Sequence, residues 1–135
     1  MKVIFDNNIW ISFLIGKRLS LLRPLLDYPS VEIYYCSQLE AEFMDVAHRP
    51  KIMKYVGETQ ITLIHQLMIS RCKLAITLDT VVTPVRDPKD VYLLALADAI
   101  DADILVSGDS DLTDLGQHNR TRIIDFSTFV RMLLP

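Results

Sequence analysis

The sequence predicts an α/β fold, with three layers of helix, sheet and helix around a central, mainly parallel sheet of five strands. Three observations predict it: short β-branched apolar runs, longer stretches of helical periodicity between them, and helix-capping residues where these stretches begin. The 135 residues contain no linker, internal repeat or low-complexity tract. We therefore expect one domain over residues 1–135, which is long enough to bury a core without disulfides or a structural metal.

Five apolar runs, each bounded by polar or turn-forming residues, predict the strands. They are residues 2–5, 32–36, 74–78, 104–107 and 122–125. Because helical stretches separate most of them, we expect mainly parallel pairing with helices on both faces of the sheet. In open sheets of this kind, ligands bind beyond the carboxyl ends of the strands.

The helices are predicted from apolar spacing and from their first residues. They are expected at residues 8–15, 20–28, 37–49, 58–71, 87–100 and 127–134, with a short helical turn at 110–115. Ser37 and Glu40 have the spacing of a capping box, and Pro50 is expected to stop the helix that they open. Asp87 and Pro88 suit the N-cap and the first position of the helix that follows them.

Composition favours a folded protein in a reducing compartment. Half of the residues are apolar and 23% are charged, which is not the composition of a disordered chain. Cys36 and Cys72 lie far apart and form no metal-binding pair, so we expect reduced thiols and a cytoplasmic location. The first ten residues are too polar for a signal peptide, and no apolar run has the length of a membrane span.

Two carboxylates in the first half of the chain are candidate metal ligands. Asp6 directly follows the first predicted strand, and Asn8 is placed to orient its carboxylate. The alternative is that Asp6 only caps the first helix, since aspartate is a favoured N-cap. Glu42 lies at the margin of the apolar stripe of the helix over 37–49, where a carboxylate needs a partner or a cation. The alternative for Glu42 is an ordinary surface glutamate.

Two pairs of aspartates in the second half are further candidates. Asp87 and Asp90 are spaced i, i+3 at the start of a predicted helix. Capping explains Asp87, whereas Asp90 has only the weaker reason of the helix dipole and is the better ligand candidate. Asp109 and Asp111 follow the fourth predicted strand beside Gly108, which lets the backbone turn sharply. One of these two aspartates could equally be a helix cap.

Considered together, these acids point to a divalent cation. Parallel strand order brings most of them to one edge of the sheet, where clustered carboxylates repel unless protons or a metal neutralise them. Hard oxygen ligands favour Mg²⁺ or Mn²⁺ over zinc, and such an ion activates water and stabilises charge on a transferring phosphoryl group. The three histidines have no metal-ligand spacing, and the sequence contains no glycine-rich phosphate loop or nucleophile-elbow serine.

The net charge of −3 at first argues against a nucleic-acid partner. Five of the negative charges belong to candidate ligands, and without these five the formal charge would be +2. The remainder of the chain is therefore mildly basic. Basic residues that could contact phosphates, or else form ordinary solvated surface, are Lys17, Arg18, Arg49, Lys51 and Lys54.

The order and spacing of these motifs resemble those of PIN-domain nucleases, and more narrowly the toxin components of bacterial and archaeal toxin–antitoxin systems. The segments that carry the resemblance are residues 3–8, 37–51, 87–90, 106–112 and 124–126. Two positions depart from the family pattern. Asn7 stands where threonine or serine is usual, and Ser107 stands where threonine is common.

The resemblance implies a PIN-like fold with acidic, catalytic ligands for Mg²⁺ or Mn²⁺. These ligands would be Asp6, Glu42, Asp90 and Asp109, with Asp111 as an auxiliary metal ligand. Asn8 and Ser107 would support them.

The resemblance also implies an endoribonuclease that hydrolyses RNA phosphodiester bonds as the toxin of a toxin–antitoxin pair. Its partners would be RNA, an antitoxin protein and further copies of itself in a homodimer or higher oligomer, with no membrane. Two alternatives remain open. One is a catalytically weak PIN-like module that binds RNA or protein. The other is an aspartyl-phosphate receiver-type domain with Asp6 as phosphoacceptor, although Asn8 stands where such a domain has a second aspartate.

Overall fold

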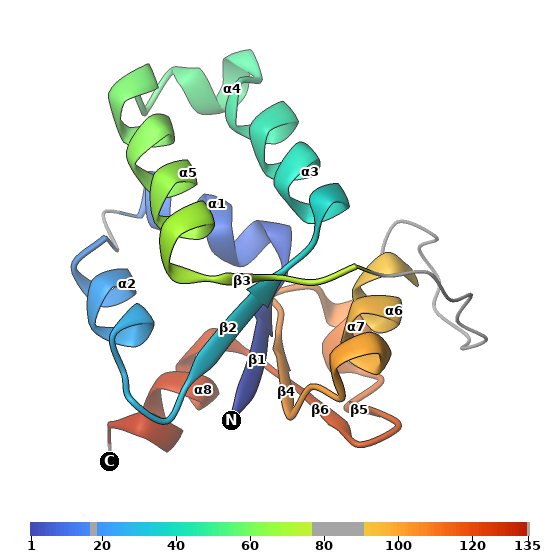
Figure 1. Cartoon of the computed structure of the whole chain (residues 1–135). Helices are drawn as coiled ribbons and strands as arrows, with labels where there is room; N and C mark the ends of the chain where they lie inside the picture. Colours follow the sequence, from blue (N-terminus) through green and yellow to red (C-terminus); the bar gives the residue numbers. More distant parts are fainter. Residues whose placement is uncertain (17–18, 77–90, 135) are drawn as a thin grey trace.

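A central sheet organises the computed structural model, which describes residues 1–16, 19–76 and 91–134. Within these residues the sheet has six strands in the order β3-β2-β1-β4-β6-β5 (Figure 1). They are β1 (Lys2–Phe5), β2 (Glu32–Tyr35), β3 (Lys73–Leu74), β4 (Ile104–Val106), β5 (Gln117–His118) and β6 (Thr121–Ile124). All neighbouring strands pair in parallel except β5 and β6. The predicted α/β class with a mainly parallel sheet is confirmed.

The sheet has one strand more than the five predicted, because the prediction omits β5. This strand pairs antiparallel with β6 across a tight turn, in which Asn119 has a φ of 52°. Its two residues, Gln117 and His118, form no apolar run that could mark it in the sequence. The third predicted strand, over 74–78, is wrong at both ends where it is described, since β3 begins at Lys73 and ends at Leu74, and residues 77–78 lie outside the described ranges.

Helices flank this sheet on both sides. Those in the described ranges are α1 (Asn7–Ile15), α2 (Leu19–Leu26), α3 (Ser37–Ala47), α4 (Pro50–Met53), α5 (Glu58–Arg71), α6 (Val91–Ile100), α7 (Ser110–Thr113) and α8 (Phe126–Leu133). In Figure 1, α3 and α5 extend beyond the ends of the strands as an antiparallel pair joined by α4, while α2 and α6 lie on opposite sides of the sheet. None of these helices is long and apolar enough to cross a membrane.

Most predicted helices are confirmed to within two residues at each end. The prediction over 37–49 ends too late, since α3 stops at Ala47 and Pro50 begins α4 as its first residue. The helix predicted over 87–100 is described only from Val91 onward, as α6. Asp87, Pro88 and Asp90 therefore lie outside the described residues.

The capping box predicted for Ser37 and Glu40 is wrong. The N-cap of α3 is Cys36, which makes no side-chain capping bond, and Ser37 is already the first helical residue. Because β2 ends at Tyr35, Cys36 is the single residue between strand and helix. The Glu40 carboxylate is instead hydrogen-bonded to His65 Nε2 on α5, at 2.7 Å.

An aromatic cluster fixes α1 and α8 against β1. Phe5, the last residue of β1, makes edge-to-face contacts with Trp10 of α1 and Phe129 of α8, each at 5.7 Å between ring centroids. All three side chains are fully buried. Since Asp6 directly follows Phe5, this packing also determines where the first candidate carboxylate leaves the sheet.

Candidate active site

A small polar pocket lies at the carboxyl ends of β1 and β4. It has a volume of about 30 Å³, which is room for roughly one water molecule or one ion. The residues that line it are Asp6, Asn7, Asn8, Glu42, Tyr92, Leu93 and Asp109. Three acids that are 36 and 67 positions apart in sequence, Asp6, Glu42 and Asp109, therefore share one pocket.

Strand register brings Asp6 beside the end of β4. Phe5 pairs with Val106, and the Asp6 amide donates to the Val106 carbonyl at 3.0 Å. Asp6 follows Phe5 and Ser107 follows Val106, so these two residues lie side by side where β1 and β4 end. The Ser107 hydroxyl donates a hydrogen bond to Asp6 Oδ2.

Asp6 is both a helix cap and a buried acid. Its Oδ1 accepts a hydrogen bond from the Ile9 amide at 2.9 Å, so it is the N-cap of α1, and the residue is only 3% exposed. Burial raises its pKa above the ordinary value, and the negative charge of Asp109 adds to this rise. Hydrogen bonds from Ser107 and from the Ile9 and Gly108 amides act in the opposite direction but do not cancel the effect of burial.

Asp109 also combines capping with a place in the pocket. Its Oδ1 accepts from the Asp111 amide at 2.9 Å, which makes it the N-cap of α7. Its own amide donates to the Ser107 hydroxyl oxygen at 3.0 Å. Asp111, the predicted auxiliary ligand, lies in the first turn of α7 and is not among the residues that line the pocket.

Tyr92 is the pocket residue that the sequence analysis missed. Its hydroxyl donates a hydrogen bond to Glu42 Oε2 at 2.6 Å, linking α6 to α3. Burial first, and then this contact with Glu42, raise the pKa of Tyr92, so the hydroxyl stays protonated as a donor. The sequence feature that could have identified Tyr92 is its hydroxyl group, since the residues around it at the start of the helix after Asp90 are otherwise apolar.

The two asparagines beside Asp6 differ in their surroundings. Asn7 is 6% exposed, and its Oδ1 has no hydrogen-bond partner among the described residues. Such a buried, unpaired acceptor calls for a donor or a cation. Asn8 is exposed and also lines the pocket. Within the described residues, the hydrogen bonds that orient Asp6 come from Ser107 and backbone amides and not from Asn8.

The donor set of this pocket fits a hard divalent cation. All of its charged groups are carboxylates, one of them desolvated, and the unpaired Asn7 oxygen is an additional neutral oxygen donor. Within the described part of the chain, however, no group of three or more His, Cys, Asp or Glu side chains converges closely enough to hold a metal. Asp90, a predicted ligand, is not among the described residues.

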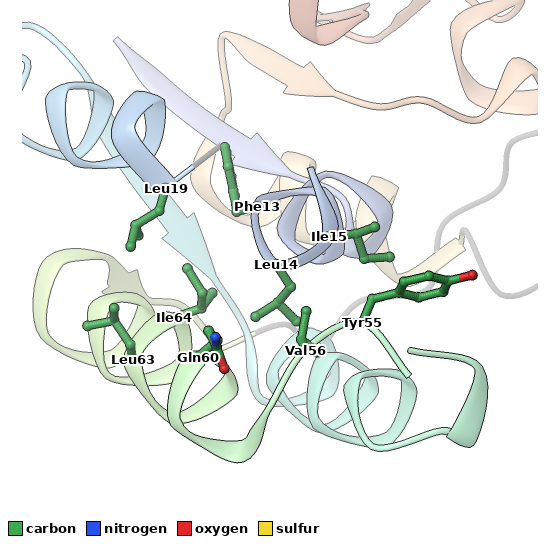
Figure 2. Close-up of a pocket in the computed structure, with 9 residues that line it drawn as sticks. All are labelled: Phe13, Leu14, Ile15, Leu19, Tyr55, Val56, Gln60, Leu63 and Ile64. Carbon is green, nitrogen blue, oxygen red and sulfur yellow. The ribbon is translucent and has the colours of Figure 1, made fainter. Parts of the chain in front are cut away.

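A second, apolar pocket of about 290 Å³ lies between the end of α1 and the start of α5 (Figure 2). Its lining residues are Phe13, Leu14, Ile15, Leu19, Tyr55, Val56, Gln60, Leu63 and Ile64. Among the described residues, no carboxylate, histidine or cysteine lines it. It therefore has none of the groups that metal-assisted hydrolysis requires.

Comparison with known families identifies this arrangement. The family model of the PIN domain matches residues 2–111, which include the segments that carry all five candidate acids. This chain belongs to the PIN domain family. PIN domains form a family of nucleases that use divalent metals, in agreement with the oxygen-rich pocket.

Two solved structures share the PIN fold with this chain. One is VapBC2 from Rickettsia felis bound to a DNA fragment from their promoter, with a TM-score of 0.59 and 15% identity over 91% of this chain and 97% of that chain. The other is the PIN domain of T. brucei RRP44, with a TM-score of 0.50 and 14% identity over 96% of this chain and 79% of that chain. At such identities, the matches show the fold alone. No curated protein matches the sequence significantly.

Proposed function

We propose that this PIN domain is a metal-dependent endoribonuclease that hydrolyses RNA phosphodiester bonds with Mg²⁺ or Mn²⁺. The observation that carries the proposal is the pocket shared by Asp6, Glu42 and Asp109, together with the buried, unpaired oxygen of Asn7. Asp90 and Asp111 complete the proposed set of ligands on the strength of the family pattern. Ser107 and Asn8 support them.

Asp6 is the anchor of the proposed site. The Ile9 amide and the Ser107 hydroxyl each hold one of its oxygens, so the carboxylate keeps its place in the pocket. Burial disfavours its negative charge, and a cation in the pocket would offset that cost. When bound, a divalent ion would polarise a phosphate oxygen and lower the pKa of a bound water molecule.

The remaining pocket residues shape access to this site. Asp109 is held at the end of β4 by its bond to the Asp111 amide, and Leu93 closes the pocket beside Tyr92 with an apolar wall. Asn8, which is exposed at the rim, is placed to hydrogen-bond a ribose or phosphate group of the RNA backbone.

The test is RNA cleavage with Mn²⁺, compared between wild type, Asp6→Asn and Asp101→Asn. Asp101 is an exposed aspartate with a φ of 51°, a conformation that asparagine tolerates, so its variant makes the same chemical change away from the pocket. We expect metal-dependent cleavage by wild type and Asp101→Asn, and loss of at least a hundredfold in Asp6→Asn, as when a group that stabilises the transition state is removed. Undiminished cleavage by Asp6→Asn would contradict the proposal.

We also propose an antitoxin protein as partner. Membership of the PIN family and the shared fold with VapBC2 support this proposal. The pocket of Figure 2 offers a partner's apolar side chains a place to bury, because Ile15 is 44% and Tyr55 73% exposed at its edge. Co-expression with the product of a small neighbouring gene should suppress cleavage, and unchanged cleavage would argue against this partner. Self-association stays a prediction, to be checked by light scattering.

A catalytically weak binding module is the second candidate. The observation that favours it is the lack of three converging acids within the described residues. Tight RNA binding with no turnover in either Mg²⁺ or Mn²⁺ would support it over the nuclease. An aspartyl-phosphate receiver is less consistent with the structure, because Asp6 is buried, whereas a phosphoacceptor has to be reached by its phosphodonor.

A further inference from the structure

Each of the three acids that share the polar pocket has its own hydrogen-bond donor. Ser107 donates to Asp6 Oδ2. The Asp111 amide donates to Asp109 Oδ1. Glu42 has a donor on a different helix, the Tyr92 hydroxyl of α6, which reaches its Oε2 at 2.6 Å.

Glu42 depends on its donor more than the two aspartates do. Asp6 and Asp109 are short side chains that follow strands directly and cap the next helix, so the backbone limits their positions. Glu42 has one more rotatable bond and lies within α3, and no ion pair holds it among the described residues. Freezing such a side chain costs conformational entropy, unless a neighbour has already restricted it.

We propose that Tyr92 is a positioning residue that holds Glu42 for the divalent cation. Its hydroxyl donates to Oε2 and so fixes the orientation of the carboxylate, whose remaining lone pairs stay available to the ion. The inference rests on the proposed function, because Glu42 is a metal ligand only if the protein is the metal-dependent nuclease proposed above. Tyr92 itself contacts neither metal nor RNA in this proposal, and it acts through Glu42.

The primary test measures Mn²⁺ affinity of the whole chain by titration calorimetry. Tyr92→Phe removes the hydroxyl and keeps the ring, so we expect affinity to fall about ten- to hundredfold, as is typical when a hydrogen bond to a metal ligand is lost. The chain contains a matched control. Tyr34 donates to Glu32 Oε2 at 3.2 Å within β2, and neither residue lines the polar pocket. Tyr34→Phe should leave the affinity unchanged.

A double-mutant cycle separates positioning from a general loss of structure. If Tyr92 acts through Glu42, then Tyr92→Phe should have no further effect on Mn²⁺ affinity once Glu42→Gln is present. The thermal midpoint of metal-free Tyr92→Phe should also match that of wild type within a few degrees. An equal loss of affinity in both backgrounds would overturn the inference, since a damaged scaffold would act regardless of residue 42.

The outcomes also distinguish this inference from the proposed function. If wild type binds Mn²⁺, Asp6→Asn abolishes binding and Tyr92→Phe binds like wild type, then only the role of Tyr92 is overturned. If wild type binds neither Mn²⁺ nor Mg²⁺, both proposals fail. Both proposals are supported if Tyr92→Phe loses Mn²⁺ affinity, Tyr34→Phe does not, and Tyr92→Phe has no further effect in the Glu42→Gln background.

Discussion

The two roles of the Asp6 side chain make opposite demands on its charge. As N-cap of α1 it needs an oxygen acceptor for the Ile9 amide, which a neutral asparagine provides equally well. As a buried acid next to Asp109, its charge is unfavourable, and its pKa is raised mainly by burial. The charge therefore costs stability in the metal-free protein, and it is useful only when a cation is present.

Replacing Asp6 with Asn should stabilise the metal-free protein at neutral pH, because burial disfavours the negative charge that Asn lacks. The folded pKa of Asp6 lies above its ordinary value of 3.8, so its ionised form is disfavoured in the fold at neutral pH. This penalty disappears as the pH falls through the folded pKa towards 3.8, and the advantage of the variant should shrink with it. Thermal unfolding in EDTA at several pH values measures the difference. Adding Mn²⁺ should stabilise wild type but not Asp6→Asn. A less stable metal-free variant at neutral pH would refute this prediction.

Both cysteine thiols should be unreactive in the native protein. Burial raises the pKa of Cys72 to about 12, and burial also raises the pKa of Cys36. Because the thiolate is the reactive form, titration with a disulfide reagent at pH 8 should detect neither thiol in the folded chain and both in guanidinium chloride. A thiol that reacts fast without denaturant would mean that one of these sites opens locally.

At the scale of single elements, short-range patterns predicted well where the determining residues are neighbours in sequence. The bounds of α5 match the prediction, since Gly57 and the periodicity after it are local signals. The capping box at the start of α3 was wrong because the partner of Glu40 is His65, which is 25 residues away on α5. β5 was omitted because pairing with β6, and not an apolar pattern of its own, makes it a strand.

The contact of α8 with β1 allows a prediction about the stability of the fold. Phe129 is fully buried against Phe5, and removing its ring leaves a cavity beside β1, the strand that Asp6 follows. Phe129→Ala should lower the free energy of unfolding by about 3–5 kcal/mol. Met132, 42% exposed on the same helix, provides the control, and Met132→Ala should change stability by less than about 0.5 kcal/mol. Urea titration distinguishes the two, and equal effects would show that α8 is not anchored through its aromatic residue.

At the scale of the whole molecule, parallel order explains which part of the site could be predicted. The rule that carboxyl ends of parallel strands share one edge placed Asp6 and Asp109 correctly in one region. The rule could not say that Asp111, two residues on, lies outside the pocket, because that depends on how α7 turns. Nor could it find Tyr92, since its bond to Glu42 spans 50 residues between two helices.

The exposed basic residues predict where the RNA of the proposed activity would bind. Lys51 and Lys54 are exposed, belong to α4 and its C-cap, and have no ion-pair partner among the described residues. Tyr55 beside them is 73% exposed and can stack on a base. By contrast, Arg49 is paired with Asp45 at 2.9 Å. The two lysines are therefore the better candidates for phosphate contacts.

Reversing both lysine charges should weaken RNA binding while leaving the acid pocket intact. For Lys51→Glu/Lys54→Glu we expect a higher KM for a long single-stranded RNA, with little change in kcat. We also expect the plot of log binding constant against log salt concentration to have a slope that is less steep by about 1.4, since each lost phosphate contact to a single strand contributes about 0.7.

The double variant Arg23→Glu/Arg131→Glu is the control for long-range repulsion, because it changes the net charge by the same amount on α2 and α8. If both pairs raise KM and flatten the salt dependence to the same extent, net charge and not contact at α4 governs binding. A specific loss in the lysine pair would instead place the RNA across α4, which directly follows α3, the helix that carries Glu42.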